Sequence, residues 1–432
     1  MRSRDFFVTE CSSELSALGA SSNQLFIQFG SDAADVVATT QGAAQVFIVP
    51  RRFQPLTAQF GPFNLIQPFV NAVLDHTPVR IVITGLSGAT ADLARISAAL
   101  GIETALTIFD ASVLAPRDGA MHRWTQGLLG CVDYVISGDP TLADVLNHHY
   151  PQLKLAQYDA LPLKPLHVGA YSQSFGYESY AFGMRDHALL MAMQQALTGH
   201  FSECQSVLDV GSGTGVFLEC LRRENIPAQG VERNEQSARF AKSLGLKVAV
   251  YDALDFLADQ RGAFDGIYCS HFVEHLPFVG VDHLVKLVAQ ALQPGGTAVF
   301  VFPDPESIRS QLLGFWRDPE HVRFYHPDIL SVLGRAHGLS MVHNSQNIPG
   351  RCVGHFSLAP PLELESPEVV QTGSGWWSGL LARMGIVHIS EMHRERTLRL
   401  QLQKNLEQLW AVNQTWAWED NATLVFRKPI HG

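Results

Sequence analysis

A short apolar run is followed by a turn whose glycines would let a ligand touch the backbone. The run, residues 207–210, contains Asp209, and the turn carries Gly211, Gly213 and Gly215. Glycine has no Cβ and adopts left-handed backbone angles readily, so it suits a close approach. A helix expected over 216–223 would point its free N–H groups into the same space. The pattern predicts a buried strand, a tight turn and a helix start around a ligand site.

The spacing is not that of a dinucleotide site. In G-x-G-x-x-G, two residues separate the second and third glycines. Here Thr214 alone stands between Gly213 and Gly215. A lone glycine-rich turn is weak evidence, so the residues that follow decide its meaning.

Polar side chains follow the next three expected strands. They are Glu232 and Arg233 at the end of 228–232, Asp252 and Ala253 after 245–250, and Ser270 at the end of 264–270. A helix over 284–292 and a Pro-Gly-Gly turn at 294–296 then lead to a fifth strand, 297–302. A helix over 327–337, stopped by Gly338, precedes a sixth strand over 339–344.

This series resembles the Rossmann-like S-adenosylmethionine (SAM) methyltransferases, over roughly residues 180–345 plus a final strand. The resemblance implies SAM as the cofactor, with Glu232 on the ribose hydroxyls and Asp252 on the adenine amino group. The cofactor-binding residues it implies are Asp209, Gly211, Gly213, Gly215, Glu232, Arg233, Asp252, Ala253 and Ser270. A different doubly wound nucleotide binder is the alternative.

The loop after 264–270 begins with two histidines, His271 and His275, on either side of Glu274. The pattern also fits the H-x-x-E-H of inverted zinc peptidases, which requires both histidines on one helix. Pro277 follows here, so no metal site is predicted, although the Glu274/His275 pair does not exclude a divalent ion. Methyl transfer to oxygen requires loss of the acceptor proton, for which histidine is suited. The predicted catalytic residues are His275, His321 and His271, with Glu274 behind them.

A second motif, Trp-Arg-Asp-Pro-x-His-Val-Arg-x-Tyr over 316–325, resembles methyltransferases of bacterial surface-polysaccharide and O-antigen synthesis. Aromatic faces stack on sugars, and arginine forks bind carboxylate or phosphate. The resemblance implies a glycan or glycolipid acceptor. The predicted substrate-binding residues are Trp316, Arg317, Arg323 and Tyr325. A structural loop anchored by Trp316 is the alternative.

The fold class predicted is α/β, with a Rossmann-like seven-stranded methyltransferase sheet. The predicted domains are an N-terminal α/β domain over 1–165, the methyltransferase core over 166–345, a helical insertion over 346–420 and the final strand within 421–432. The first domain alternates strands and helices, which favours a parallel sheet. Its residues 80–146 also resemble part of the acceptor-side half of GT-B glycosyltransferases. The seventh strand, 422–426, is expected antiparallel at the sheet edge.

The insertion carries two further patterns. Residues 376–386 are short and largely apolar, and suit either a membrane interface or a plug over the substrate site. Residues 391–412 place Leu398, Leu402, Asn405, Leu409 and Val412 at alternating steps of four and three. This is a coiled-coil seam, so a homodimer through 391–412 and packing on its own domain both remain open.

Composition limits the partners. Lys and Arg number 31 against 41 Asp and Glu, a net charge of −10, which disfavours nucleic acid. The six cysteines are scattered, as expected of reduced thiols in a cytoplasm. No apolar run approaches the length of a membrane span. We therefore expect a cytoplasmic protein without a transmembrane segment, with peripheral membrane docking left open.

The sequence thus predicts a SAM-dependent O-methyltransferase, with a sugar hydroxyl or phosphate of a bacterial surface glycan precursor as acceptor. One alternative is a methyltransferase of a quinone or other natural product. Another is a non-catalytic scaffold that binds SAM, which would release no S-adenosylhomocysteine with any acceptor.

Overall fold

The computed structural model describes residues 185–347 and 420–430 continuously and the rest of the chain in pieces. The longer pieces are 5–9, 25–30, 44–50, 63–76, 80–84, 88–108, 127–137, 141–151, 153–156 and 396–407. The end of the predicted first domain, residues 157–165, and most of 346–420, including most of 376–386, lie outside the described residues. Two compact units are present: Met1–Ser270 with Lys286–Val299 and Arg427–Gly432, and His271–Val285 with Phe300–Phe426.

The N-terminal part contains one eight-stranded sheet in the order β3-β4-β2-β1-β5-β6-β7-β8. Its strands pair in parallel except β3, which is antiparallel to β4. Their bounds are β1 Asp5–Thr9, β2 Leu25–Gly30, β3 Thr39–Gln41, β4 Ala44–Pro50, β5 Arg80–Thr84, β6 Glu103–Thr107, β7 Tyr134–Ile136 and β8 Lys154–Ala156. The helices are α3 Phe63–His76, α4 Gly88–Ala99 and α6 Thr141–His149. The parallel sheet expected from the alternation of strands and helices is confirmed.

The second sheet has seven strands in the order β11-β10-β9-β12-β13-β15-β14. The strands are β9 Val207–Val210, β10 Ala228–Glu232, β11 Val248–Val250, β12 Phe264–Ser270, β13 Leu292–Pro303, β14 Ser340–Asn344 and β15 Asn421–Arg427. The helices and short turns are α9 His187–Gln195, η3 Thr198–Phe201, α10 Val216–Arg223, α11 Glu235–Ser243, α12 Ala253–Ala258, η4 Val273–His275, α13 Phe278–Ala291, η5 Ser310–Gly314, η6 Phe315–Arg317 and α14 Pro327–Ala336. The predicted α/β class is therefore confirmed.

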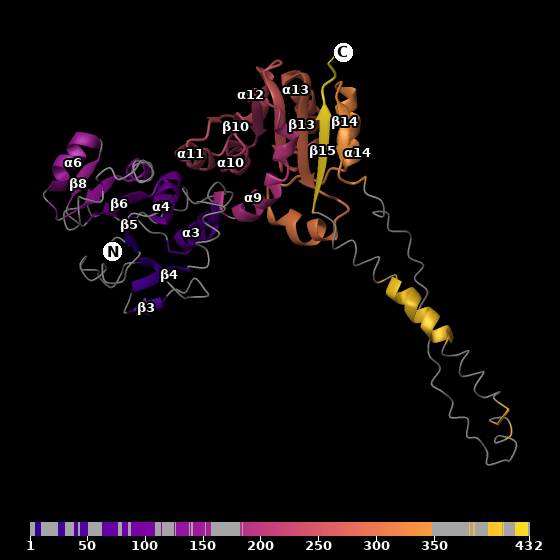
Figure 1. The fold of residues 1–432 in the computed structure, drawn as a ribbon, viewed down its shortest axis with the longest axis horizontal. Coiled ribbons are helices and arrows are strands. Elements are labelled where there is room, and N and C mark those ends of the chain that lie inside the picture. The colour runs from indigo at the N-terminus through magenta and orange to yellow at the C-terminus, as the bar shows by residue number, and fades with distance from the viewer. Residues whose placement is uncertain are drawn as a thin grey trace. The chain divides into compact units, whose positions relative to one another are not determined.

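The last strand does not lie at the edge of this sheet. β15 lies between β13 and β14, so β14 and β11 form the edges (Figure 1). Asp304 N–H donates to the Asp420 carbonyl at 2.8 Å, while the rings of Phe300 and Phe426 pack edge to face. The first contact joins the end of β13 to the start of β15, and the second joins an earlier residue of β13 to a later residue of β15. The two strands are therefore antiparallel. The predicted direction was right, and the predicted edge position was wrong, because every inner residue of β15 from Ala422 to Phe426 is buried.

Three element boundaries differ from the prediction by more than one residue. β11 keeps only the last residues of 245–250, because Gly245 has φ +79° and ends α11 instead. α13 begins at Phe278, directly after Pro277, rather than at residue 284. β13 begins at Leu292, because Gly295 and Gly296 exchange hydrogen bonds with Lys428 and extend the ladder into the predicted turn.

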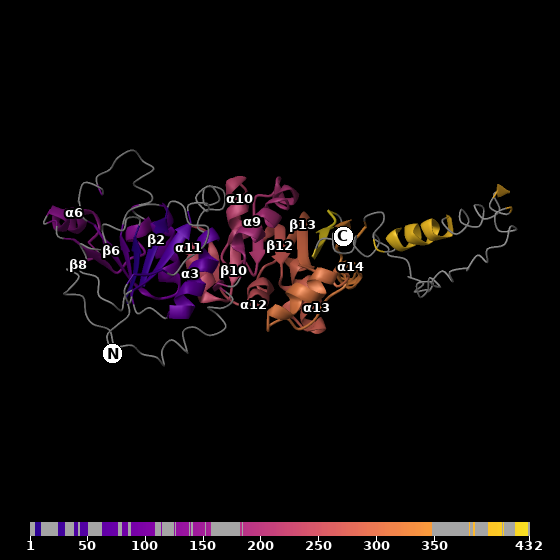
Figure 2. The same cartoon turned by 90° about the horizontal axis from the view of Figure 1, so that it is seen from below.

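Within the first unit, α3 and α4 pack against α9 and α11 (Figure 2). Phe240 of α11 is fully buried and meets Phe63 and Phe182 edge to face, at centroid distances of 5.9 and 5.8 Å. Gly183 faces α3 so closely that a Cβ there would lie 2.2 Å from Val70. α3 and α11, together with Phe182 and Gly183, therefore share an apolar core.

Few residues of the C-terminal insertion are described. Residues 396–407 are helical, and Leu398 and Leu402 of the predicted seam are exposed. The described helices include none that is both long and apolar enough to cross a membrane.

Candidate functional site

The glycine turn has the backbone that its sequence predicts. Gly211, Gly213 and Gly215 have φ of +70°, +53° and +82°, in the left-handed region that favours glycine. The N–H groups of Gly211 and Ser212 both donate to the Val231 carbonyl at 3.0 Å, which fixes the turn to β10. A Cβ on Gly213 would meet no atom within 4 Å. The turn therefore presents bare backbone to open space.

Glu232 is held beside this turn by two backbone donors. Gly213 N–H donates to Oε2 and Asn234 N–H donates to Oε1, both at 2.7 Å. The side chain is 9% exposed. Because two rigid N–H groups orient the carboxylate, its remaining lone pairs have fixed directions and can accept from a ligand hydroxyl.

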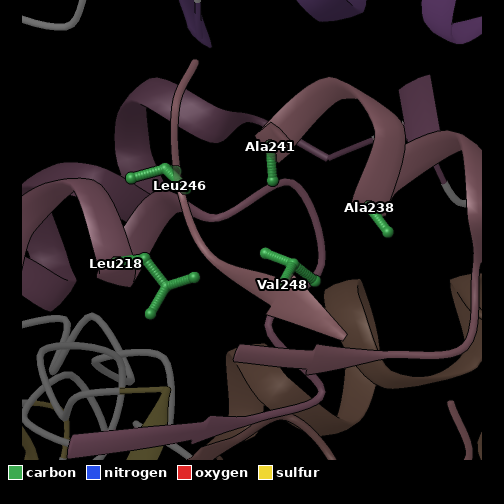
Figure 3. Close-up of a cluster of buried hydrophobic side chains, with 5 residues drawn as sticks. All are labelled: Leu218, Ala238, Ala241, Leu246 and Val248. Atoms are coloured by element: carbon green, nitrogen blue, oxygen red, sulfur yellow. The ribbon is translucent and has the colours of Figure 1, made fainter. Parts of the chain in front are cut away.

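A buried apolar cluster packs against the glycine turn. Leu218, Ala238, Ala241, Leu246 and Val248 form a buried cluster that draws from α10, α11 and β11 (Figure 3). A Cβ on Gly215 would lie 2.6 Å from Leu246 Cδ1 and 3.1 Å from Ala241 Cβ. Gly230 is equally constrained, since a Cβ there would lie 2.4 Å from Ser212 Oγ. Gly215 and Gly230 are thus required for close packing, whereas Gly213 leaves room for a ligand to approach the backbone.

The other predicted cofactor residues have varied surroundings. Asp209 is 3% exposed, and burial, followed by the nearby Glu232 carboxylate, raises its pKa well above the usual value. Asp252 is exposed and caps α12, where its Oδ1 accepts from Leu254 and Asp255 N–H. Ala253 is buried, Ser270 is half-buried at the end of β12, and Arg233 is exposed.

In the second unit, the H-x-x-E-H segment forms a 3-10 turn, η4, and not the helix that a zinc peptidase requires. His271 has φ +51°, unusual for a side chain other than glycine, and its N–H donates to the Val301 carbonyl at 2.8 Å. Its Nδ1 lies 3.1 Å from Glu274 Oε1. His271 is therefore a partner of Glu274 and braces the turn.

Glu274 is 1% exposed. Burial alone would raise its pKa, but the hydrogen bond with His271 and the charges of His271 and His275 outweigh it, so the pKa is lowered. Its backbone carbonyl accepts from Val322 N–H at 2.8 Å. This bond joins η4 to the loop that carries His321.

The two histidines predicted from separate motifs are brought together. The rings of His275 and His321 pack edge to face, with centroids 4.8 Å apart. His321 Nδ1 lies 2.5 Å from the Phe315 carbonyl oxygen, and its Nε2 lies 3.9 Å from Asp318 Oδ2. His275 Nδ1 lies 4.0 Å from Glu320 Oε2. The pair thus forms an imidazole cluster edged by carboxylates.

The predicted substrate-binding residues separate into two kinds. Trp316 is 72% exposed, and Arg317 and Arg323 are exposed as well. Tyr325 is 1% exposed, its hydroxyl donates to the Leu276 carbonyl at 2.7 Å, and Arg323 lies over its ring. Tyr325 therefore ties this loop to η4, whereas the other three are largely exposed to solvent.

Some supporting residues were not predicted. The Phe315 carbonyl orients His321, and the Phe315 ring stacks on Phe324 at 3.7 Å. Glu320 approaches His275. The density of aromatic residues in 315–325 was the available signal, but it does not reveal which rings stack and which face solvent.

Residues 183–344 match the family model described as a methyltransferase domain. A ubiquinone biosynthesis O-methyltransferase of Bordetella avium (strain 197N) is 28% identical over 116 residues, which cover 25% of this chain and 47% of that protein. One of Xanthomonas campestris pv. campestris (strain B100) is 30% identical over 99 residues, which cover 21% and 40%. A crystal structure of a SAM-dependent methyltransferase from Archaeoglobus fulgidus is 23% identical, with a TM-score of 0.41, and the match covers 59% of this chain and 99% of that one.

The chain therefore carries a methyltransferase domain over residues 183–344. It spans about half or less of the length of these two curated relatives. The cofactor that such a domain implies is S-adenosylmethionine. The residues present fit it, because the space in front of Gly213 is open and Glu232 is oriented there by backbone donors.

Proposed function

We propose that this chain is a SAM-dependent methyltransferase that methylates an oxygen of a hydroxylated acceptor. The observation that carries the proposal is the Glu232 carboxylate, fixed by Gly213 and Asn234 N–H at the open side of the glycine turn. A vicinal diol offers two donors to such a carboxylate. This is the chemistry expected of a site that holds a ribose.

SAM supplies a methyl group on a sulfonium, from which an attacking oxygen can take it. For its part, the glycine turn leaves room for the ligand at Gly213, while Glu232 would fix the ribose. Asp252 Oδ1 caps α12, so its Oδ2 would accept a hydrogen bond from the adenine amino group. Holding the donor in one orientation lowers the entropic part of the barrier.

On the acceptor side, we assign His275 and His321 to the reacting hydroxyl. A neutral imidazole nitrogen can accept its proton near neutral pH. Glu274 and His271 would act by holding η4 in place rather than by touching the acceptor. Nearby Glu320 favours the imidazolium that forms when His275 takes a proton.

For the acceptor we propose a hydroxylated glycan or its lipid-linked precursor. Trp316 and Arg317 are exposed in η6, and Arg323 is exposed in the following loop, which carries His321. An indole face can stack on a sugar ring, and two guanidinium groups can bind phosphate or carboxylate. The sequence resemblance of 316–325 supports the same class.

A phenolic quinone precursor is the second candidate. The observation that favours it is that the curated relatives named above are ubiquinone biosynthesis O-methyltransferases. A phenol is more acidic than a sugar hydroxyl, so this acceptor would depend less on a histidine base. The two classes therefore differ in how strongly His321→Gln should lower kcat.

The test is SAM binding by calorimetry, followed by release of S-adenosylhomocysteine in the presence of glycolipid extract or a catechol. Wild type should bind SAM at micromolar Kd, and Glu232→Ala should not, while Glu235→Ala, altered at an exposed position, should match wild type. Absence of binding by the wild type would refute the proposal. Binding without product from any acceptor would favour a scaffold.

A further inference from the structure

Three side chains able to bind a metal ion lie together in the second unit. Glu274, His275 and His321 each offer a ligand atom, and these atoms all lie within 4.8 Å of one another. Glu274 and His275 come from η4, and His321 comes from the loop after η6. The hydrogen bonds from Val322 N–H to the Glu274 carbonyl and from Tyr325 to the Leu276 carbonyl hold the two segments together.

His321 has the orientation of a metal ligand. Its Nδ1 lies 2.5 Å from the Phe315 carbonyl oxygen, which can only accept, so Nδ1 carries the ring proton. In a neutral ring, Nε2 then holds the free lone pair. In metal-binding histidines the N–H of the second ring nitrogen commonly donates to a carbonyl in this way, which fixes both tautomer and ring direction.

Glu274 has an oxygen whose burial needs a partner. Oε1 is engaged by His271, but Oε2 is buried and has no hydrogen-bond partner within the part of the chain that the structure describes. A buried carboxylate oxygen without a partner costs free energy. A cation bound between Oε2 and the two imidazoles would remove that cost.

The donor set favours a transition metal. Two imidazoles and one carboxylate suit Zn²⁺ and its neighbours, whereas Mg²⁺ and Ca²⁺ prefer oxygen ligands throughout. Ligands at about 2.1 Å from a tetrahedral ion lie about 3.4 Å apart, so ligand atoms now up to 4.8 Å apart would approach one another by at most about 1.4 Å. Glu320 and Asp318, at 4.0 Å from His275 and 3.9 Å from His321, offer further oxygens or outer hydrogen bonds.

We propose that Glu274, His275 and His321 bind one divalent transition-metal ion, with Zn²⁺ as the preferred occupant. Three protein ligands leave a coordination position open. If the proposed methyl transfer holds, an acceptor hydroxyl occupies that position and loses its proton more readily, since a bound cation lowers the pKa of a coordinated hydroxyl. As ligands of the ion, His275 and His321 no longer act as the base, and the proton released from the hydroxyl passes to solvent water.

The experiment uses the full chain, freed of metal with a chelator and titrated with CoCl₂ and ZnCl₂. We expect one ion per chain by calorimetry, and a visible Co²⁺ absorption band that Zn²⁺ abolishes. His321→Gln and Glu274→Gln should weaken Co²⁺ binding at least tenfold. The control, His337→Gln, alters a histidine that pairs with Asp282 at 2.8 Å outside the cluster and should bind as wild type does.

Circular dichroism and SAM affinity report whether each variant is folded. Absence of a Co²⁺ band in the wild type overturns the inference, and so does a band that survives His321→Gln unchanged. The proposed function and the proposed metal site are tested by different outcomes. Ion binding without methyl transfer to any acceptor would refute the function and leave the metal site standing, whereas full methyl transfer by a chain that binds no ion would refute the metal site alone.

Discussion

Ser212 Oγ occupies the space that a side chain at position 230 would need. A Cβ on Gly230 would lie 2.4 Å from this oxygen and 2.6 Å from Ser212 Cβ, and both atoms belong to a turn that is bonded to the Val231 carbonyl. The turn cannot yield without losing that hydrogen bond. The position of the cofactor turn therefore depends on the smallness of a residue in the neighbouring strand.

The first prediction follows from this contact. Gly230→Ala should lower the free energy of unfolding by about 1–3 kcal/mol, the usual cost of overpacking. It should also weaken SAM binding, because the displaced turn carries Gly213. Chemical denaturation and calorimetry measure the two effects. Gly199→Ala is the matched control, since a Cβ there would meet nothing within 4 Å; equal behaviour of the two variants would contradict the argument.

A milder substitution at Glu232 separates the contribution of the carboxylate charge to SAM binding from that of the side-chain shape. Glu232→Gln keeps the side-chain length but removes a charged acceptor from Gly213 N–H and from the ligand. A hydrogen bond to a charged group contributes about 1.5–3 kcal/mol, so SAM affinity should fall about ten- to hundredfold. Calorimetry checks the affinity. An unchanged Kd would mean that this carboxylate does not contact the ligand.

The link between Tyr325 and η4 should affect the acceptor side alone. Tyr325→Phe deletes the hydroxyl that donates to Leu276, at a cost of about 1 kcal/mol in stability. We expect kcat to fall while the Kd for SAM stays the same. Tyr251→Phe, altered at an exposed ring, is the control. A loss of SAM affinity in Tyr325→Phe alone would contradict this separation.

Buried His187 should make the first unit sensitive to acid. Burial, together with the charge of Arg185, lowers its pKa from 6.5 to about 3. Between pH 6.5 and pH 3, His187 is protonated in the unfolded chain and neutral in the folded chain. The free energy of unfolding therefore has its full value above pH 6.5 and falls as the pH is lowered toward 3. The loss between pH 7 and pH 5 should be about 2 kcal/mol.

Denaturation of His187→Phe at both pH values tests this statement, because phenylalanine keeps the stacking on Phe63 without a titrating group. The difference in stability between pH 7 and pH 5 should shrink by about the same 2 kcal/mol. His200→Phe, altered at an exposed position, is the control. An undiminished difference in His187→Phe would assign the acid sensitivity to other groups.

The apolar core shared by α3 and α11 predicts that 1–165 and the following sheet depend on each other. Phe63→Ala removes a ring that contacts both Phe240 and His187, and should cost about 3–5 kcal/mol. A chain that starts at residue 166 should likewise expose Phe240 and aggregate. Light scattering measures this, and a stable, monodisperse fragment would show that the shared core is dispensable.

Local sequence predicts the elements around the glycine turn well. β9, α10, β10 and β12 begin and end as predicted, because their alternation of apolar runs, glycines and polar strand ends is strong. Asp209 lies in β9 and Glu232 ends β10, as the strand pattern predicts. The reason is that each of these features depends on residues within one strand, turn and helix.

Features that depend on distant residues were harder to predict. Nothing in the pattern of 421–427 indicates whether the strand lies at the edge of the sheet or inside it. The meeting of His275 with His321 requires a 3-10 turn, a buried Tyr325 and a carbonyl from Phe315, none of which has a sequence signature. Motif reasoning singled out the two histidines that the fold brings together, and tertiary packing decided which groups surround them.

The interior position of β15 also governs the order in which the chain can assemble. β14 emerges from the ribosome before the whole 345–420 segment, yet its neighbour in the sheet is β15, which is made after it. Until then, the exposed edge of β13 and the unpaired β14 are open to wrong partners. Nascent chains stalled before residue 421 should therefore recruit chaperones, and completion of β15 should release them.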